Sequence, residues 1–145
     1  MDQEAGALNE KSALQFSVAV AGLVPVTAGA IGALRPDLLG FAGASSALTH
    51  AAYLSGLLLG IGLGFWSAIP AIETRRGRFT LLTGFVVLGG LARLLTATRL
   101  GVWTPSVFLP LVMELGVTPA LWLWQGRVSK FTPSSLRWPE GRETE

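Results

Sequence analysis

Two oppositely charged residues, Arg93 and Glu114, lie inside long apolar stretches of this 145-residue chain. Arg93 interrupts the run GFVVLGGLARLLTATRLG, and Glu114 interrupts a second run that follows a short turn. A charge at the centre of a membrane helix costs roughly 3 kcal/mol when no partner offsets it. A guanidinium and a carboxylate can form two parallel hydrogen bonds with each other. These two residues are therefore the first candidates for a polar site inside a membrane.

The connection between the two runs puts Arg93 and Glu114 at similar depth. Only residues 99–104 separate the runs, and connections this short join antiparallel neighbours. Counted from the turn, both residues lie about half a span deep, with an axial offset on the order of 5 Å. The spacing therefore predicts an Arg93–Glu114 ion pair. Two roles remain open: a structural clamp that fixes the register of the two helices, or part of a pocket for a ligand head group or a proton.

The single histidine, His50, and the single tyrosine, Tyr53, are the other polar candidates. Their spacing of three puts them on one face of a helix. His50 could ligate a metal ion or a porphyrin-type ring, but metal sites normally have three or more protein ligands. The alternative is an interfacial histidine with ordinary hydrogen bonds. The sequence shows no set of nucleophile, base and acid, so we expect no catalytic residues, no metal and no cofactor, with a bound lipid as the compatible small molecule.

Four apolar stretches can position these residues in a membrane. Half of the residues are hydrophobic and only 14% are charged, against roughly 25% in an average soluble domain. A bilayer core needs about 20 helical residues. The sequence predicts an all-α polytopic membrane protein, a bundle of four antiparallel transmembrane helices within residues 12–126. The spans cover about 12–34, 49–71, 79–100 and 105–126.

Prolines and a threonine predict local features of these spans. Thr104 suits the N-cap of span four, with Pro105 at its first helical position. Pro25 should kink span one, and Pro110 and Pro119 should disturb span four, because proline removes a backbone hydrogen bond.

Lysine and arginine are distributed unequally between the two sides of the predicted bundle. Four spans put both termini and the loop between spans two and three on one side. That side holds eight cations and the other holds two, which predicts cytoplasmic termini. Residues 1–11 form a polar cytoplasmic segment, and the basic, aromatic tail 127–145 suits the inner membrane surface. The eight are Lys11, Arg75, Arg76, Arg78, Arg127, Lys130, Arg137 and Arg142, and the two are Arg35 and Arg99.

Span two carries glycines at a spacing of four, Gly56, Gly60 and Gly64, which Ala52 and Ala68 extend. Such a ridge of small residues lets another helix come close. Two uses follow: packing inside the bundle, or an interface with another protein.

Three stretches of the chain resemble those of a known family. They are YLSGLLLGIGLGFW (53–66), GGLARLL (89–95) and MELGVTPALWLW (113–124). They are similar to a family of small bacterial four-helix integral membrane proteins classed as a domain of unknown function. The resemblance implies that Arg93 and Glu114 are family features, and it implies no activity.

The small size and the glycine ridge favour a non-enzymatic accessory or assembly subunit of a larger complex in the bacterial cytoplasmic (inner) membrane. Expected partners are membrane lipids and other membrane subunits or further copies of the chain. No basic block suits nucleic acid. The alternative is a binder or transporter of a small apolar or lipid-like ligand at Arg93 and Glu114. A third hypothesis is a lipid-modifying enzyme with Glu114 as the acid–base group and His50 or Tyr53 as auxiliaries, but the sequence lacks the remaining catalytic groups.

Overall fold

The computed structural model describes residues 2–39 and 45–131, and within them every regular element is a helix. No strand occurs in this part of the chain, so the predicted all-α fold class is confirmed. The elements are α1 (Asp2–Leu34), the 3-10 turn η1 (Pro36–Leu39), α2 (Ser45–Ala68), the 3-10 turn η2 (Ile69–Ala71), α3 (Arg76–Leu100), α4 (Pro105–Val112), the π-helical turn η3 (Met113–Val117) and α5 (Thr118–Phe131).

Four helical segments are long and apolar enough to cross a membrane, which confirms the four predicted spans. The second span begins at Ser45 rather than near residue 49, because α2 includes part of the predicted loop. Residues 2–11 of the predicted polar segment belong to α1, whose 33 residues extend over about 50 Å. The hydrocarbon core of a bilayer is only about 30 Å thick, so one end of α1 projects beyond it. The segments are Asn9–Leu34, Ser45–Ala71, Arg76–Leu100 and Pro105–Ser129.

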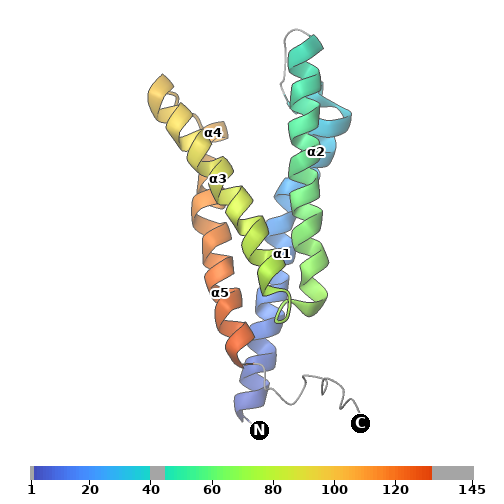
Figure 1. Cartoon of the computed structure of the whole chain (residues 1–145), viewed down its shortest axis with the longest axis vertical. Coiled ribbons are helices and arrows are strands. Elements are labelled where there is room, and N and C mark those ends of the chain that lie inside the picture. The colour runs from blue at the N-terminus through green and yellow to red at the C-terminus, as the bar shows by residue number, and fades with distance from the viewer. Residues whose placement is uncertain (1, 40–44, 132–145) are drawn as a thin grey trace, which may run out of the picture.

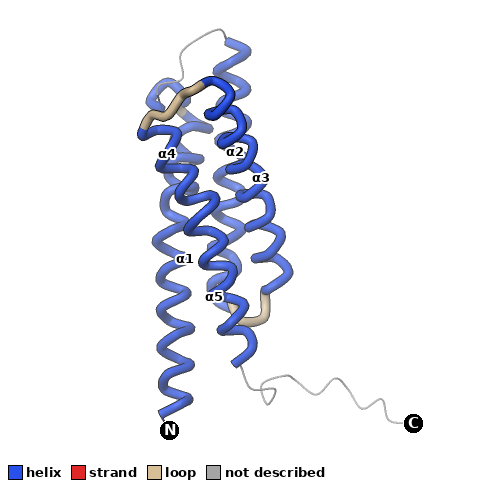
Figure 2. Tube along the Cα trace, turned by 90° about the vertical axis from the view of Figure 1, so that its left-hand side faces the viewer, coloured by secondary structure: helices blue, strands red, loops and turns tan. Residues whose placement is uncertain are grey.

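The spans form two antiparallel hairpins that meet at one end and diverge toward the other (Figure 1). In one hairpin, α1 and α2 pack together extensively, and in the other α3 packs against η3 and α5. The N-terminus, the turn between α2 and α3, and the end of α5 lie where the hairpins meet, which we call the closed end. Figure 2 shows the turn before α4 at the opposite, open end.

The hydrophobic core lies at the closed end. Phe65 of α2 and Phe79 of α3 pack edge to face, with ring centroids 5.0 Å apart and an angle of 77° between the rings. This geometry contributes roughly 0.5–1.5 kcal/mol beyond the burial of the rings. Phe79 is only 1% exposed. The buried members of the core are Leu14, Val18, Phe65, Ala68, Ile72, Phe79 and Val128.

Two glutamine side chains donate hydrogen bonds to backbone carbonyls where α2 ends. The Nε2 atom of Gln15 donates to the carbonyl of Ile69, and that of Gln125 donates to the carbonyl of Ile72, both at 2.7 Å. The last carbonyls of a helix have no partner within the helix. Away from water such carbonyls are costly to leave unpaired. The two amides thereby tie α1 and α5 to the end of the second span.

Two further polar contacts connect α1 to α2 and to the turn that follows the second span. Lys11 Nζ lies 2.8 Å from Glu73 Oε1. Trp66 Nε1 donates to the carbonyl of Ala19 at 3.2 Å. The closed end is therefore held by polar contacts as well as by its apolar core.

Glycines permit the close approach of α1 and α2. A Cβ atom at Gly29 would overlap the backbone of Leu59, and one at Gly62 would lie 2.7 Å from Val26 Cγ2. Both sites therefore depend on the missing side chain, as is usual where membrane helices touch.

The predicted ridge on α2 plays only part of the expected packing role. A Cβ atom at Gly64 would lie 3.0 Å from the side chain of Leu82, so Gly64 packs against α3. At Gly56 and Gly60 such an atom would meet nothing within 4 Å, and both residues are exposed. The prediction that these two glycines pack inside the bundle is therefore wrong. The physical reason is that α1 contacts the neighbouring face of α2, where Gly62 lies.

The helix start predicted at Thr104 is present with a different side-chain contact. Thr104 is the N-cap of α4, and Pro105 is its first helical residue. The Thr104 hydroxyl lies 2.8 Å from the hydroxyl of Ser106 rather than bonding a backbone N–H. Pro25 lies inside α1, which continues through it as a single helix.

Candidate functional site

Arg93 of α3 and Glu114 of η3 form a bidentate ion pair. Arg93 Nε donates to Glu114 Oε2 at 3.1 Å, and Arg93 Nη2 donates to Oε1 at 3.0 Å. Two parallel hydrogen bonds fix the orientation of both side chains as well as their distance. The ion pair predicted from matched depth is therefore present, and it joins the two helices of the second hairpin.

Glu114 lies on a widened turn of its helix. The backbone N–H of Thr118 reaches back five residues to the carbonyl of Met113, and its hydroxyl donates to the same carbonyl at 2.8 Å. This π-helical turn lies between Pro110 and Pro119, neither of which has a backbone N–H to donate. The expected disturbance of span four thus takes the form of a π turn. Such turns are rare and occur frequently at functional sites.

Gly90 allows the π turn to approach α3. A Cβ atom at Gly90 would lie 2.8 Å from Leu115 Cδ2 and 2.9 Å from Glu114 Cβ. Gly90 precedes Arg93 by three residues, so it lies next to Arg93 on the same face of α3. Sequence reasoning did not assign it a role, although it belongs to the stretch GGLARLL. The glycine therefore sets the distance that the ion pair requires.

The ion pair leaves part of the guanidinium without a protein partner. An arginine side chain has five N–H donors, and the carboxylate occupies two of them. No other hydrogen bond joins Arg93 to a residue that the structure describes, and its side chain is 43% exposed against 19% for Glu114. Within the hydrocarbon region, unmet donors are unfavourable. Arg93 can therefore donate a hydrogen bond to a further oxygen acceptor.

An open groove of about 410 Å³ lies beside Arg93 on the side toward the open end. Arg93 and Thr96 supply its polar groups, and the Thr96 hydroxyl donates to the carbonyl of Ala92 at 3.0 Å. The ion pair has no net charge, so the groove suits an apolar molecule that carries a neutral oxygen acceptor. The lining residues are Ala92, Arg93, Thr96, Ala97, Leu100, Val102 and Val107.

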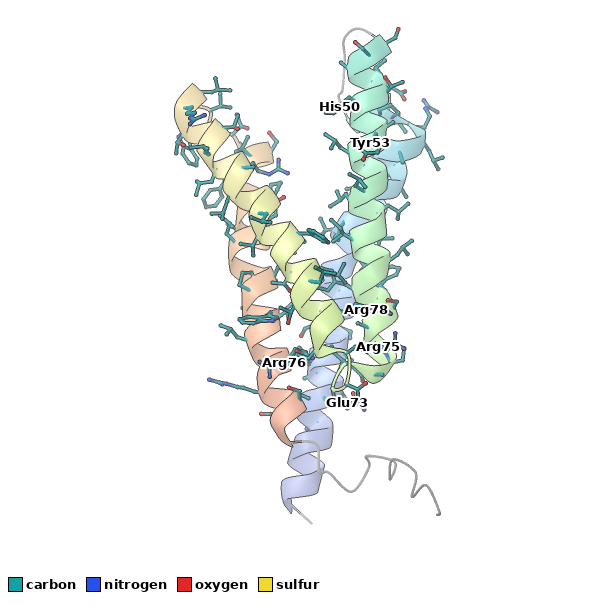
Figure 3. All side chains as sticks on the ribbon, viewed as in Figure 1. His50, Tyr53, Glu73, Arg75, Arg76 and Arg78 are labelled. Carbon is teal, nitrogen blue, oxygen red and sulfur yellow. The ribbon has the colours of Figure 1, made fainter. Side chains whose placement is uncertain are left out.

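His50 and Tyr53 lie away from this groove. Both are on α2 toward the open end, in the other hairpin (Figure 3). Both are exposed, and neither lines the groove beside Arg93. The geometry therefore does not bring the predicted auxiliary residues to Glu114. Within the described ranges, no group of three His, Cys, Asp or Glu residues could hold a metal ion.

The predicted membrane-surface tail is described only in part. Helix α5 includes its first residues up to Phe131. Arg137, Arg142 and the remaining residues after 131 lie outside the described part, so their contact with lipid stays a prediction.

Comparison with family models gives a match that covers most of the chain. A family model described as Domain of unknown function (DUF4345) matches residues 13–125. The matched range includes Arg93, Glu114 and the greater part of all four spans. No curated protein and no solved structure matches the chain. The resemblance drawn from the three sequence stretches is thereby confirmed.

Proposed function

This chain belongs to the family of domains of unknown function DUF4345, and from that premise we propose that it is a non-enzymatic accessory or assembly subunit of a larger membrane complex. The four spans make it a multi-pass membrane protein. The partner in this proposal is a transmembrane helix of another protein that packs against the Gly56–Gly60 face of α2.

The proposed location is the bacterial cytoplasmic membrane with both termini in the cytoplasm. Eight of the eleven lysine and arginine residues belong to the segments that share a side with the termini. Cations near the ends of spans favour the cytoplasmic side. The closed end of the hairpins would then face the cytoplasm.

The exposed Gly56–Gly60 face is the observation that carries this proposal. Membrane helices associate where small residues let two backbones approach. Helix α1 packs against Gly62 of α2, and α3 packs against Gly64. At Gly56 and Gly60, by contrast, a Cβ atom would meet nothing within 4 Å. Toward the open end, α2 also diverges from α3 (Figure 1). A helix surface of this kind is suited to a neighbour from another chain.

Site-specific crosslinking in native membranes tests this assignment. The chain has no cysteine, so photoreactive groups or single cysteines can be introduced without background from native thiols. We expect a photoreactive group at Leu57, which neighbours Gly60 on the surface of α2, to crosslink to one other protein in a fixed ratio. Gentle detergent extraction should recover the same protein.

The matched variants separate docking from non-specific association. Gly56→Leu/Gly60→Leu should abolish recovery of the partner, because the larger side chains keep the helices apart. Gly84→Leu is the control, since Gly84 is likewise exposed with nothing within 4 Å of a Cβ atom. Equal recovery from both variants would contradict the proposal. A crosslink only to a second copy of the chain would contradict a partner from another protein and would indicate a homo-oligomer instead.

The groove beside Arg93 supports a second candidate function, the binding of a lipid-like molecule. Arg93 lines a groove that is otherwise mostly apolar, and the ion pair uses only two of its five N–H donors. A molecule with a carbonyl or hydroxyl oxygen on a hydrocarbon body would satisfy the remaining donors. In this function the ion pair positions the guanidinium for the ligand.

Mass spectrometry of lipids that copurify with the protein tests this second candidate. The informative variant is Arg93→Leu/Glu114→Leu, which removes both charges and leaves neither unpaired. If this double variant folds and loses one molecular species that the unchanged protein retains, the ligand function is supported. If the retained lipids are unchanged, the pair has a structural role.

A further inference from the structure

Two arginines from different helices line one pocket at the closed end. Arg76 is the first residue of α3, and Arg127 lies near the end of α5. They share a pocket of about 490 Å³. The pocket therefore combines cations that are far apart in the sequence. Its lining residues are Arg76, Ala120, Trp122, Leu123, Trp124, Gly126 and Arg127.

The side chain of Arg76 reaches across from α3 to Gly126 of α5. A Cβ atom at Gly126 would lie 3.4 Å from Arg76 Nη2, so the guanidinium rests directly over this glycine. Arg127 follows Gly126 in the sequence and lines the same pocket as Arg76. Figure 3 shows Arg76 next to α5, whereas Arg75 and Arg78 lie by the end of α2.

Neither arginine of the pocket has a carboxylate partner in the described ranges. The ion pairs found there are Lys11–Glu73, Arg35–Asp37 and Arg93–Glu114. The carboxylate of Glu73, the nearest in sequence to Arg76, is thus occupied by Lys11. Both pocket arginines are exposed. Two positive charges that line one pocket and have no carboxylate partner among the described residues favour an anion there.

The remaining walls of the pocket are apolar and aromatic. Trp122 directs its Nε1 atom to the Thr80 hydroxyl at 2.8 Å, which anchors the indole between α5 and α3. Trp124 and the 62% exposed Leu123 extend the apolar surface. Tryptophan is enriched where the hydrocarbon region meets the head groups. A free inorganic anion would use the arginines but not this apolar wall.

We propose that the pocket formed by Arg76, Arg127, Trp122 and Trp124 binds the phosphodiester head group of an anionic phospholipid. The two guanidinium groups contact the phosphate oxygens, and the acyl chains lie along Leu123 and the indoles. Guanidinium groups match phosphate geometry with two parallel hydrogen bonds. The site lies in the leaflet at the closed end and is separate from the Arg93 groove.

Lipid binding can be measured on the full chain by native mass spectrometry and by thermal unfolding in detergent. The probes are phosphatidylglycerol, phosphatidylcholine and inorganic phosphate. Phosphatidylglycerol should bind and raise the unfolding temperature, whereas phosphatidylcholine and phosphate should do so far less. An equal effect of inorganic phosphate would overturn the assignment to a lipid.

Paired charge-removal variants test whether the pocket itself is the binding site. Arg76→Gln/Arg127→Gln should lower the affinity for phosphatidylglycerol about tenfold or more, since each substitution removes charge-assisted hydrogen bonds to the phosphate. Arg75→Gln/Arg78→Gln removes the same charge at the same end but outside the pocket. Equal losses from the two double variants would mean general attraction to anionic lipid and would overturn the proposal. If the first variant does not fold, Arg127→Gln alone replaces it, with Arg75→Gln as its control.

Discussion

The closed and open ends of this molecule differ in what holds their helices. At the closed end, the apolar core, the Phe65–Phe79 ring pair and two glutamine amides join all four spans. Toward the open end the hairpins diverge (Figure 1), and the ion pair between Arg93 and Glu114 acts within one hairpin only.

This difference suggests that the closed end determines the stability of the fold, whereas the open half provides surfaces for binding. Because the closed end contains the contacts between hairpins, it should determine the free energy of unfolding. The open half instead exposes the Gly56–Gly60 face of α2 and the groove beside Arg93. Surfaces of this kind remain available to a neighbouring helix or a lipid. Substitutions in the two regions should therefore have different consequences.

The largest expected effect comes from the core of the closed end. Phe79→Ala should lower the free energy of unfolding by about 4 kcal/mol, because it leaves a cavity and removes the ring contact with Phe65. Phe85→Ala on the same helix is the control, since Phe85 is 53% exposed, and its effect should stay below about 1 kcal/mol. Reversible unfolding in detergent measures both. Similar losses would remove the distinction between core and exposed surface.

The next effect concerns the ion pair of the second hairpin. Arg93→Leu should cost about 3 kcal/mol, because the Glu114 carboxylate is left without its partner at membrane depth. Arg93→Leu/Glu114→Leu should recover most of that loss, since no charge remains unpaired. Unfolding of the two variants in the same detergent checks this. A double variant as unstable as the single one would indicate that other contacts of Arg93 are responsible.

Four spans and one ion pair could be predicted because they depend on local sequence properties. Span length and composition define the helices, and the short turn before Pro105 matches the depths of Arg93 and Glu114. The π turn and the contact at Gly90 could not be predicted, because both depend on how two helices meet. Glycine spacing likewise shows which residues share a face of α2 but not which face α1 covers.

The glutamine contacts illustrate the same limit. Gln15 and Gln125 are polar residues near the ends of spans, where the sequence permits exposure to water. Their actual partners, the carbonyls of Ile69 and Ile72, lie more than fifty residues away. Only the three-dimensional arrangement reveals why Gln125 is fully buried.

A smaller effect is expected from the glycine that admits the π turn. Gly90→Ala should cost about 1–2 kcal/mol, because its new Cβ atom would press on Leu115 and Glu114. Gly89→Ala meets nothing within 4 Å and should be neutral or stabilising, since alanine favours helix. Comparing the unfolding temperatures of these neighbours isolates the contact. Equal temperatures would show that the two helices can move apart without cost.

The smallest effect concerns the exposed pair Arg35–Asp37 at the open end. Its hydrogen bond with Arg35 lowers the pKa of Asp37 from the usual 3.8. Because the folded-state pKa is the lower one, the pair stabilises the fold above about pH 4 and loses this contribution as pH falls through the lowered pKa. Asp37→Asn should therefore lower the unfolding temperature slightly at pH 6, with the difference vanishing in acid. A difference that grows in acid would contradict this sign.

The most direct test of the contrast between the two ends is a pair of distances between spin labels. They are measured by electron paramagnetic resonance on the protein in lipid bilayers. One labelled variant is Leu54→Cys/Leu95→Cys toward the open end, and the other is Leu63→Cys/Leu81→Cys near the closed end. All four leucines are exposed, and the chain has no native cysteine. The first pair of labels should give a clearly longer distance than the second pair. Equal distances would mean that α2 and α3 stay together along their length, which would contradict the divergence of the hairpins.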